Sequence, residues 1–204
     1  FDWAKDPKRQ PMLNNPDPSY HGMIWTEFAK AVGPIAYIVR ARFVGLRDLG
    51  PALSPQSAFQ IIQGLETVSL RMEKHCANAA KVAEYLSNHN KVSRVIYAGL
   101  DEGEAGERAN KYLKGGHGAL CGFELKGGKS SGEKFIDNLN MFYHVANIGD
   151  ARSLAIHPAT TTHSQLSDED MEAAGVNPSY VRLSIGIEHI DDILNDLKNA
   201  LDAA

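Results

Sequence analysis

The sequence has little of several features that mark particular protein classes. Only two of its 204 residues are cysteine, which disfavours a secreted disulfide scaffold and predicts buried free thiols in a cytoplasmic protein, at Cys76 and Cys121. No apolar run approaches the roughly 20 residues of a membrane-spanning helix, and no signal-peptide pattern opens the chain. Neither sign of charge dominates, since the net charge is −4, so a nucleic-acid or membrane surface is not expected. The eight histidines follow no metal-binding spacing, and we expect no metal site.

The remaining composition is that of an ordinary globular protein, with 43% hydrophobic and 23% charged residues. The length is generous for one minimal domain and allows two modest ones. Residues 1–22 contain four prolines before position 20 and little periodicity, which predicts an irregular arm that wraps a surface. Because Phe1-Asp2-Trp3 is not an initiator sequence, we expect the natural protein to extend N-terminal to Phe1.

The first half of the chain has helical periodicity. Residues 25–46 predict a helix with a break at Gly33-Pro34. The candidates for its apolar side are Phe28, Ala31, Ile35, Ile38 and Phe43. Ser54 and Pro55 then form an N-cap and first helical position for an amphipathic helix over 55–88. At about 1.5 Å per residue this helix would span on the order of 50 Å, so we expect it to link two domains and to bend at Gly64.

Strands and helices alternate after residue 90. Strands are predicted over 92–97, 118–125, 153–157 and 180–187. Helices are predicted over 102–113, over 131–141 from a capping box at Ser131, from Ser167, and over 191–204. This alternation predicts a two-layer α/β sandwich with its helices on one face.

The last predicted strand is the strongest candidate for a functional element. Val181, Leu183 and Ile185 share one face, which the helix over 191–204 should cover, and Arg182 shares the opposite, open face with small neighbours. A guanidinium held on a rigid strand is suited to bidentate binding of a carboxylate. The alternative is an arginine paired with a structural carboxylate.

Two predicted loops supply further candidates. The turn over 147–150 offers backbone amides and Asn147 to an anion, and residues 160–163 form a polar cluster after Pro158. If both loops meet Arg182, a carboxylate-sized site results. The alternative is that these are ordinary loops with local side-chain turns.

These segments carry motifs of a known family. Asn147-Ile-Gly-Asp, Ser153-Leu, His157-Pro and Thr162-His are followed by Val181-Arg-Leu-Ser-Ile-Gly-Ile-Glu; upstream stand Gly45-Leu-Arg-Asp-Leu-Gly and Leu65-Glu-Thr-Val-Ser-Leu-Arg-Met-Glu-Lys-His. The set resembles the Cys/Met-metabolism PLP-dependent enzymes over nearly the whole chain. Within that family the arm at 16–22 and the segment 36–50 are most similar to the O-acetylhomoserine sulfhydrylases.

The resemblance implies roles for individual residues. Arg182 matches the arginine that holds the substrate α-carboxylate, and Asn147, Ile148 and Thr162 match positions that line the same site. Arg47 and Asp48 match a pair that reaches the active site of a neighbouring subunit in some members.

The main departure is the cofactor lysine. The family places it in a Ser/Thr-Lys-aromatic-x-x-Gly-His motif, whereas Lys111 to His117 has one residue too many and Asn110 in place of Ser or Thr. We therefore interpret Lys111 as a false match. The pyridoxal phosphate (PLP) lysine is expected N-terminal to Phe1, with no catalytic residue in this chain.

The resemblance thus implies the C-terminal part of a fold-type-I PLP-dependent transferase. Residues 1–62 would be the tail of the large PLP-binding domain, and residues 63–204 the small α/β domain with its long linking helix. The implied activity is γ-replacement on O-acetyl-L-homoserine by sulfide, in a cytoplasmic homotetramer that includes the chain's own N-terminal half. The alternatives are a methionine γ-lyase, a cystathionine γ-synthase, or a non-catalytic binding fragment.

Overall fold

The computed structural model describes the backbone of residues 1–204 and every side chain except that of Asp168. Its contacts divide the chain into two compact units, residues 1–63 and residues 64–204, and each is described by itself. None of the helices formed by the described residues combines the length and the apolar character that crossing a bilayer requires. The assignment of the two units to a cofactor domain and a small domain stays a prediction.

The first unit is built from short helical segments around Trp25, which is fully buried and donates its Nε1 hydrogen to Asp17 Oδ2 at 2.9 Å. The predicted irregular arm contains two short helices, each with a proline at its first turn. The segments are α1 (Pro11–Asn14), η1 (Pro18–Tyr20), α2 (Trp25–Phe28), η2 (Ala29–Val32), α3 (Ala36–Arg40) and η3 (Ala41–Leu49).

The predicted break at Gly33-Pro34 is confirmed, with Gly33 at φ 98° between η2 and α3. The predicted apolar side is wrong in part, because Phe28 and Ile38 are 52% and 53% exposed and Ala31 is exposed, whereas Ile35 and Phe43 are half-buried. η2 is a 3₁₀ helix and η3 a π-helix, so the angular spacing of side chains differs from that of an α-helix. A period of 3.6 residues therefore cannot assign the buried side across this region.

The long helix predicted over 55–88 is two helices, α4 (Pro55–Glu66) and α5 (Val68–Ser87). The cap at its start is confirmed, since Ser54 Oγ accepts the backbone N–H of Ser57 at 3.0 Å. The interruption lies at Thr67 rather than at the predicted Gly64. Threonine is a weak helix former because its branched, hydroxyl-bearing side chain favours non-helical backbone contacts.

The second unit contains one five-stranded sheet with strand order β1-β2-β5-β4-β3. The strands are β1 (Val92–Ile96), β2 (Leu120–Leu125), β3 (Tyr143–His144), β4 (Leu154–Ile156) and β5 (Tyr180–Ser184). All neighbours are antiparallel except β3 and β4, which are parallel. The two-residue strand β3 was not predicted, and β5 ends at Ser184 rather than at residue 187.

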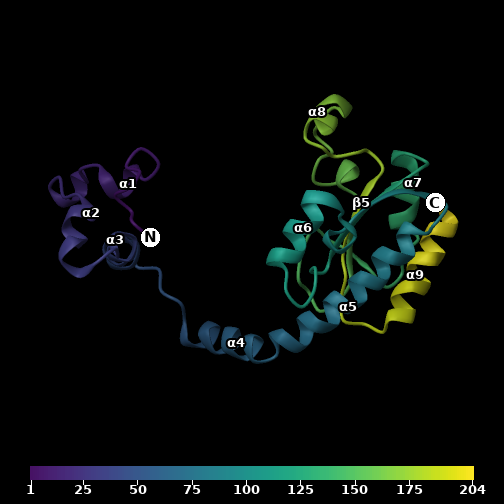
Figure 1. Cartoon of the computed structure of the whole chain (residues 1–204), viewed down its shortest axis with the longest axis horizontal. Coiled ribbons are helices and arrows are strands. Elements are labelled where there is room, and N and C mark those ends of the chain that lie inside the picture. The colour runs from purple at the N-terminus through teal and green to yellow at the C-terminus, as the bar shows by residue number, and fades with distance from the viewer. The chain divides into compact units, whose positions relative to one another are not determined.

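The helices cover one face of this sheet, as predicted. Side chains from α5, α7 (Lys129–Asp137) and α9 (Ile190–Ala203) form one apolar core with Phe123 and Leu183. In Figure 1, α5 and the yellow α9 lie side by side against the sheet, in agreement with their contacts. The other helices of the unit are η4 (Ala98–Leu100), α6 (Gly103–Tyr112), η5 (Pro158–Thr160) and α8 (Asp168–Ala173).

Two local predictions in this unit are corrected. The helix α7 begins at Lys129 after Gly128, so Ser131 lies inside it and caps nothing. Both cysteines are free, but only Cys121 is buried, since Cys76 is half-buried on α5. Burial raises the pKa of the Cys121 thiol to about 12, so this residue behaves as an apolar core side chain.

A buried carboxylate fixes α9 to the chain before β3. Asp196 is 7% exposed, and its oxygens accept the backbone N–H groups of Asn140 and Met141, each at 2.9 Å. Charge-assisted hydrogen bonds of this kind are stronger than neutral ones. Asp196 therefore anchors the loop that leads from α7 into β3 on the surface of α9.

We expect Asp196→Ala to lower the free energy of unfolding by about 2–3 kcal/mol, because it leaves buried amides without an acceptor. The urea midpoint, followed by circular dichroism, measures the loss. The matched control is Asn195→Ala, the exposed neighbour in α9, which should change stability by less than about 0.5 kcal/mol. Equal effects of the two changes would contradict this role for Asp196.

Candidate carboxylate-binding site

Arg182 lies in the middle of β5, on the face of the sheet opposite the helices. It stands across from Gly122 of β2 on one side and from Ile156 of β4 on the other. The side chain is half-buried, whereas its neighbours Val181 and Leu183 are fully buried in the core. This confirms the predicted alternation and leaves the guanidinium on the open face.

The surroundings of Arg182 are shaped by a glycine. A Cβ atom at Gly122 would collide with the ring of Tyr180, so this tyrosine lies over the glycine, two residues from Arg182. Burial raises the pKa of Tyr180, and the charge of Arg182 opposes that rise, which places the two side chains in electrostatic contact. The phenol is therefore neutral at physiological pH and leaves the positive charge of Arg182 available.

The turn that follows β3 meets Arg182. Its Nη2 donates to the backbone oxygen of Asn147 at 3.4 Å, and Gly149 N donates to Ser184 Oγ at 3.3 Å. Within the turn, Asn147 Oδ1 accepts the N–H of Ile148 at 2.9 Å, and Gly149 adopts a positive φ of 81°. The structure thus brings Arg182, Asn147 and Ile148 together, and both Asn147 and Ile148 are exposed.

The carboxylate of Glu188 fixes the segment that follows this turn. Glu188 accepts two hydrogen bonds from Ser153, from its backbone N at 2.6 Å and from its Oγ at 2.9 Å. Ser153 Oγ also accepts the N–H of Gly186 at 2.9 Å. Both residues stand in the family motifs, but sequence reasoning missed their contact, because they are 35 residues apart.

The polar loop predicted over 160–163 is partly helical, since η5 occupies residues 158–160. Its base is the fully buried His157, whose Nε2 lies 2.8 Å from the Pro178 oxygen and whose Nδ1 lies 2.9 Å from Thr160 Oγ1. A carbonyl oxygen only accepts, so Nε2 carries the proton, and the Thr160 hydroxyl also donates to the backbone oxygen of His157 at 3.2 Å. Thr162 is exposed and contacts the neighbouring His163 at 2.9 Å, and its role in a site stays a prediction.

Stability should depend on His157 at mildly acidic pH. Burial lowers the pKa of His157 below its ordinary value, so the unfolded chain binds this proton at a higher pH than the folded chain does. Its contribution is complete above pH about 6.5 and is lost as the pH falls toward the lower folded pKa. We expect the urea midpoint to fall between pH 7.5 and 5.5, with a shallower fall in His157→Gln. The exposed control His21→Asn, in the first unit, should keep the original dependence.

Arg47 and Asp48 lie in the first unit, on the π-helix η3. The Arg47 guanidinium stacks over the Phe43 ring at 5.1 Å and the Tyr20 ring at 5.6 Å, and its Nε donates to Asp48 Oδ1 at 3.1 Å. The Tyr20 hydroxyl donates to the other Asp48 oxygen, which lowers the pKa of Asp48 and raises the pKa of Tyr20. The pair is thus a charged, exposed cluster on an unusual helical turn, a geometry often found at functional sites.

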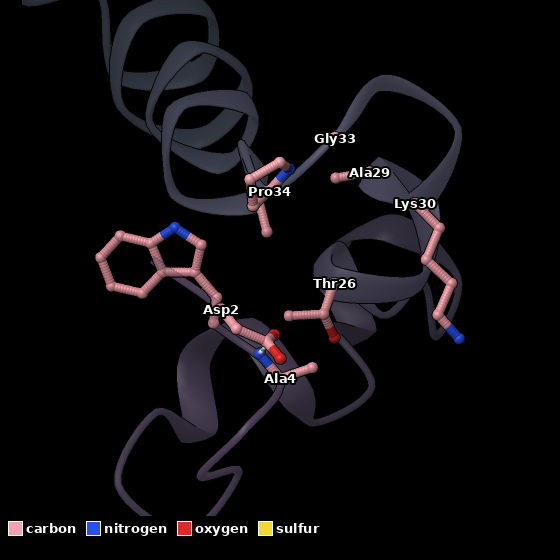
Figure 2. Close-up of a pocket in the computed structure, with 9 residues that line it drawn as sticks. Asp2, Ala4, Thr26, Ala29, Lys30, Gly33 and Pro34 are labelled. Atoms are coloured by element: carbon pink, nitrogen blue, oxygen red, sulfur yellow. Dashed lines mark hydrogen bonds between the residues drawn. The ribbon is translucent and has the colours of Figure 1, made fainter.

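The first unit also contains a cavity of about 320 Å³. Figure 2 shows Thr26, Ala29, Lys30 and Pro34 around it, together with Asp2. Thr26 is already hydrogen-bonded to Asn14 Oδ1 at 3.0 Å. None of the predicted site residues lines this cavity, and we do not assign it to the site.

The lysine side chains of the described residues lie at or near the surface of each unit. No described lysine is buried, and Lys111 lies exposed on α6 with its Nζ 5.1 Å from the Tyr112 ring centre. The interpretation of Lys111 as a false match stays a prediction. Among the described residues no group of three metal-ligating side chains converges.

Comparisons with known proteins agree with the geometry. Residues 19–202 match the family described as Cys/Met metabolism PLP-dependent enzyme. The chain is 52% identical to an O-acetyl-L-homoserine sulfhydrylase of Leptospira meyeri over 98% of its own length and 46% of that protein. It is 47% identical to a homocysteine synthase of Schizosaccharomyces pombe over 100% of the chain and 47% of that protein.

A solved structure shows the same fold. A Campylobacter jejuni protein assigned as an O-acetylhomoserine (thiol)-lyase, which carries a pyridoxyl-lysine monophosphate, superposes with a TM-score of 0.81 and 42% identity. The match covers 97% of this chain and 46% of that one. The chain therefore spans about half the length of the relatives it matches.

Proposed function

Because the chain belongs to the Cys/Met metabolism PLP-dependent enzymes, we propose that it forms the C-terminal part of an O-acetylhomoserine sulfhydrylase. The reaction is the conversion of O-acetyl-L-homoserine and sulfide to L-homocysteine and acetate. The observation that carries this proposal is the half-buried Arg182 beside the turn at Asn147. Bound PLP supplies the electron sink for such a reaction.

The residues of this chain bind and orient the substrate. Arg182 takes the α-carboxylate in a bidentate pair, and the turn at Asn147 and Ile148 lies against that carboxylate. Thr162 lines the same site. Fixing the carboxylate on a rigid central strand holds the amino acid in one orientation, which lowers the entropy still to be lost on reaching the transition state.

The chain's partners follow from the same proposal. Arg47 and Asp48 reach the active site of a neighbouring subunit, and the complete protein is a cytoplasmic homotetramer. Its lysine-bearing half precedes residues 1–62, which form the end of the large domain. Two free thiols and the absence of any disulfide among the described cysteines fit a reducing compartment.

A product assay tests the activity. Full-length protein loaded with PLP should convert O-acetyl-L-homoserine to homocysteine only when sulfide is present. Release of an α-keto acid without sulfide would identify a γ-lyase instead, and cystathionine formed from added cysteine would identify a cystathionine γ-synthase. A full-length protein without the visible absorption of a bound PLP would be a non-catalytic binding protein.

A further inference from the structure

The strongest feature outside the proposed substrate contacts is the pair formed by Glu188 and Ser153. Ser153 is fully buried, and Glu188 is half-buried just after β5. Both carboxylate oxygens of Glu188 accept from Ser153, at 2.6 Å from the backbone N and at 2.9 Å from Oγ. A charged acceptor at these distances makes strong hydrogen bonds and selects one backbone position for Ser153.

The chain on either side of this pair is packed without space to move. A Cβ atom at Gly186 would lie 2.5 Å from Ser153 N and 2.6 Å from the Ala151 oxygen, both of them backbone atoms. Ile187 N donates to that same Ala151 oxygen at 2.9 Å. The segment after β5 and the segment before β4 are thus in direct backbone contact.

Every second residue from position 182 to position 186, along β5 and the segment after it, makes a hydrogen bond to the chain between Asn147 and Ser153. Arg182 bonds Asn147, Ser184 accepts from Gly149, and Gly186 donates to Ser153. Arg182 and Ser184 point to the same face of the strand, and Gly186 adds a backbone donor after it, so the three contacts follow one another from Asn147 to Ser153. Loss of the last contact would let the turn shift relative to the guanidinium.

We propose that Glu188 is a positioning residue that sets the affinity for the amino-acid substrate by fixing, through Ser153, the turn that lies against Arg182. The role rests on the proposed function, because it acts through the carboxylate site. Glu188 has no direct contact with the carboxylate in this role. Its two oxygens are already engaged by Ser153, and it acts on the substrate only through the position of the turn at Asn147.

The test compares variants of the full-length, PLP-loaded enzyme. Glu188→Ala removes both acceptors and should raise KM for O-acetylhomoserine about tenfold or more, because small displacements of orienting groups have large effects. KM for sulfide and the visible absorption of the cofactor should stay unchanged. Glu188→Gln keeps one acceptor for Ser153 N and should raise the same KM only about threefold.

The matched control is Asp192→Asn, which removes a charge four residues away at an exposed position and should leave KM unchanged. If Glu188→Ala does not fold, Glu188→Gln and Ser153→Ala decide. A wild-type KM in Glu188→Gln would overturn the proposal. So would a variant in which kcat and the affinity for both substrates are lost together with a lower melting temperature.

Arg182→Lys separates this proposal from the function on which it rests. If Arg182→Lys weakens substrate binding and the Glu188 variants do not, the positioning role fails and the carboxylate site stands. If Arg182→Lys leaves binding unchanged, the proposed site itself fails.

Discussion

Replacing Arg182 by alanine should lower kcat/KM for O-acetylhomoserine by about 10²–10³-fold, mainly through a rise in KM. Removal of one partner from a hydrogen-bonded charge pair typically costs 2–5 kcal/mol, and a factor of ten corresponds to about 1.4 kcal/mol. Folding should change little, since Arg182 lies on the open face of the sheet and is only half-buried. Steady-state kinetics of the full-length enzyme provide the measurement.

A second arginine on the same sheet supplies the control for this change. Arg94 of β1 is 67% exposed and pairs with Glu124 at 3.7 Å. Surface pairs of this kind contribute little, so Arg94→Ala should retain kcat/KM and stability. An Arg182→Ala enzyme that is as active as Arg94→Ala would remove Arg182 from the site. Arg182→Lys should lie between wild type and Arg182→Ala, because lysine keeps the charge without the planar fork.

Substitution of Gly186 by alanine should be strongly destabilising. The added methyl group would lie 2.5 Å from Ser153 N and 2.6 Å from the Ala151 oxygen, so two backbone segments must separate. Overpacking of this kind costs about 1–3 kcal/mol, and the separation also breaks the bond from Gly186 N to Ser153 Oγ. We expect a lower urea midpoint and a raised KM for the amino-acid substrate in the same variant.

Gly64→Ala is the control for the same chemical change. Nothing lies within 4 Å of a Cβ atom at Gly64, which is within α4. Alanine is the better helix former by about 0.5–1 kcal/mol, so this variant should be neutral or slightly more stable. Equal destabilisation of both variants would show that close contact at Gly186 is not the cause.

Local periodicity carried most of the fold prediction for the second unit. The alternation in β5 identified its buried face, and the helix that follows it in sequence, α9, packs on that face as expected. The strand β3 has only two residues, both exposed, so it has no pattern to detect. In the first unit, 3₁₀ and π turns replace the α-helical period on which the prediction of Phe28 and Ile38 depended.

The site was predictable only in part. Arg182 and Asn147 were found through a strand pattern and a family motif, and the structure brings them together. The contact between Glu188 and Ser153 was not found, because it joins residues far apart in sequence and neither motif shows what its residues bind. The hydrogen bonds of Asp196 were not predicted for the same reason, since its partners precede it by 54 to 56 residues.

The strand order has a consequence for how the second unit opens. β5 has a hydrogen-bonded neighbour on each side, β2 and β4, whereas β1 and β3 form the two edges of the sheet. Fluctuations that break a sheet begin at its edges, and the central strand opens only with the whole unit. The backbone amide of Arg182 should therefore be among the slowest in the chain to exchange with solvent. A partly opened molecule that has lost β3 would still hold its arginine in place.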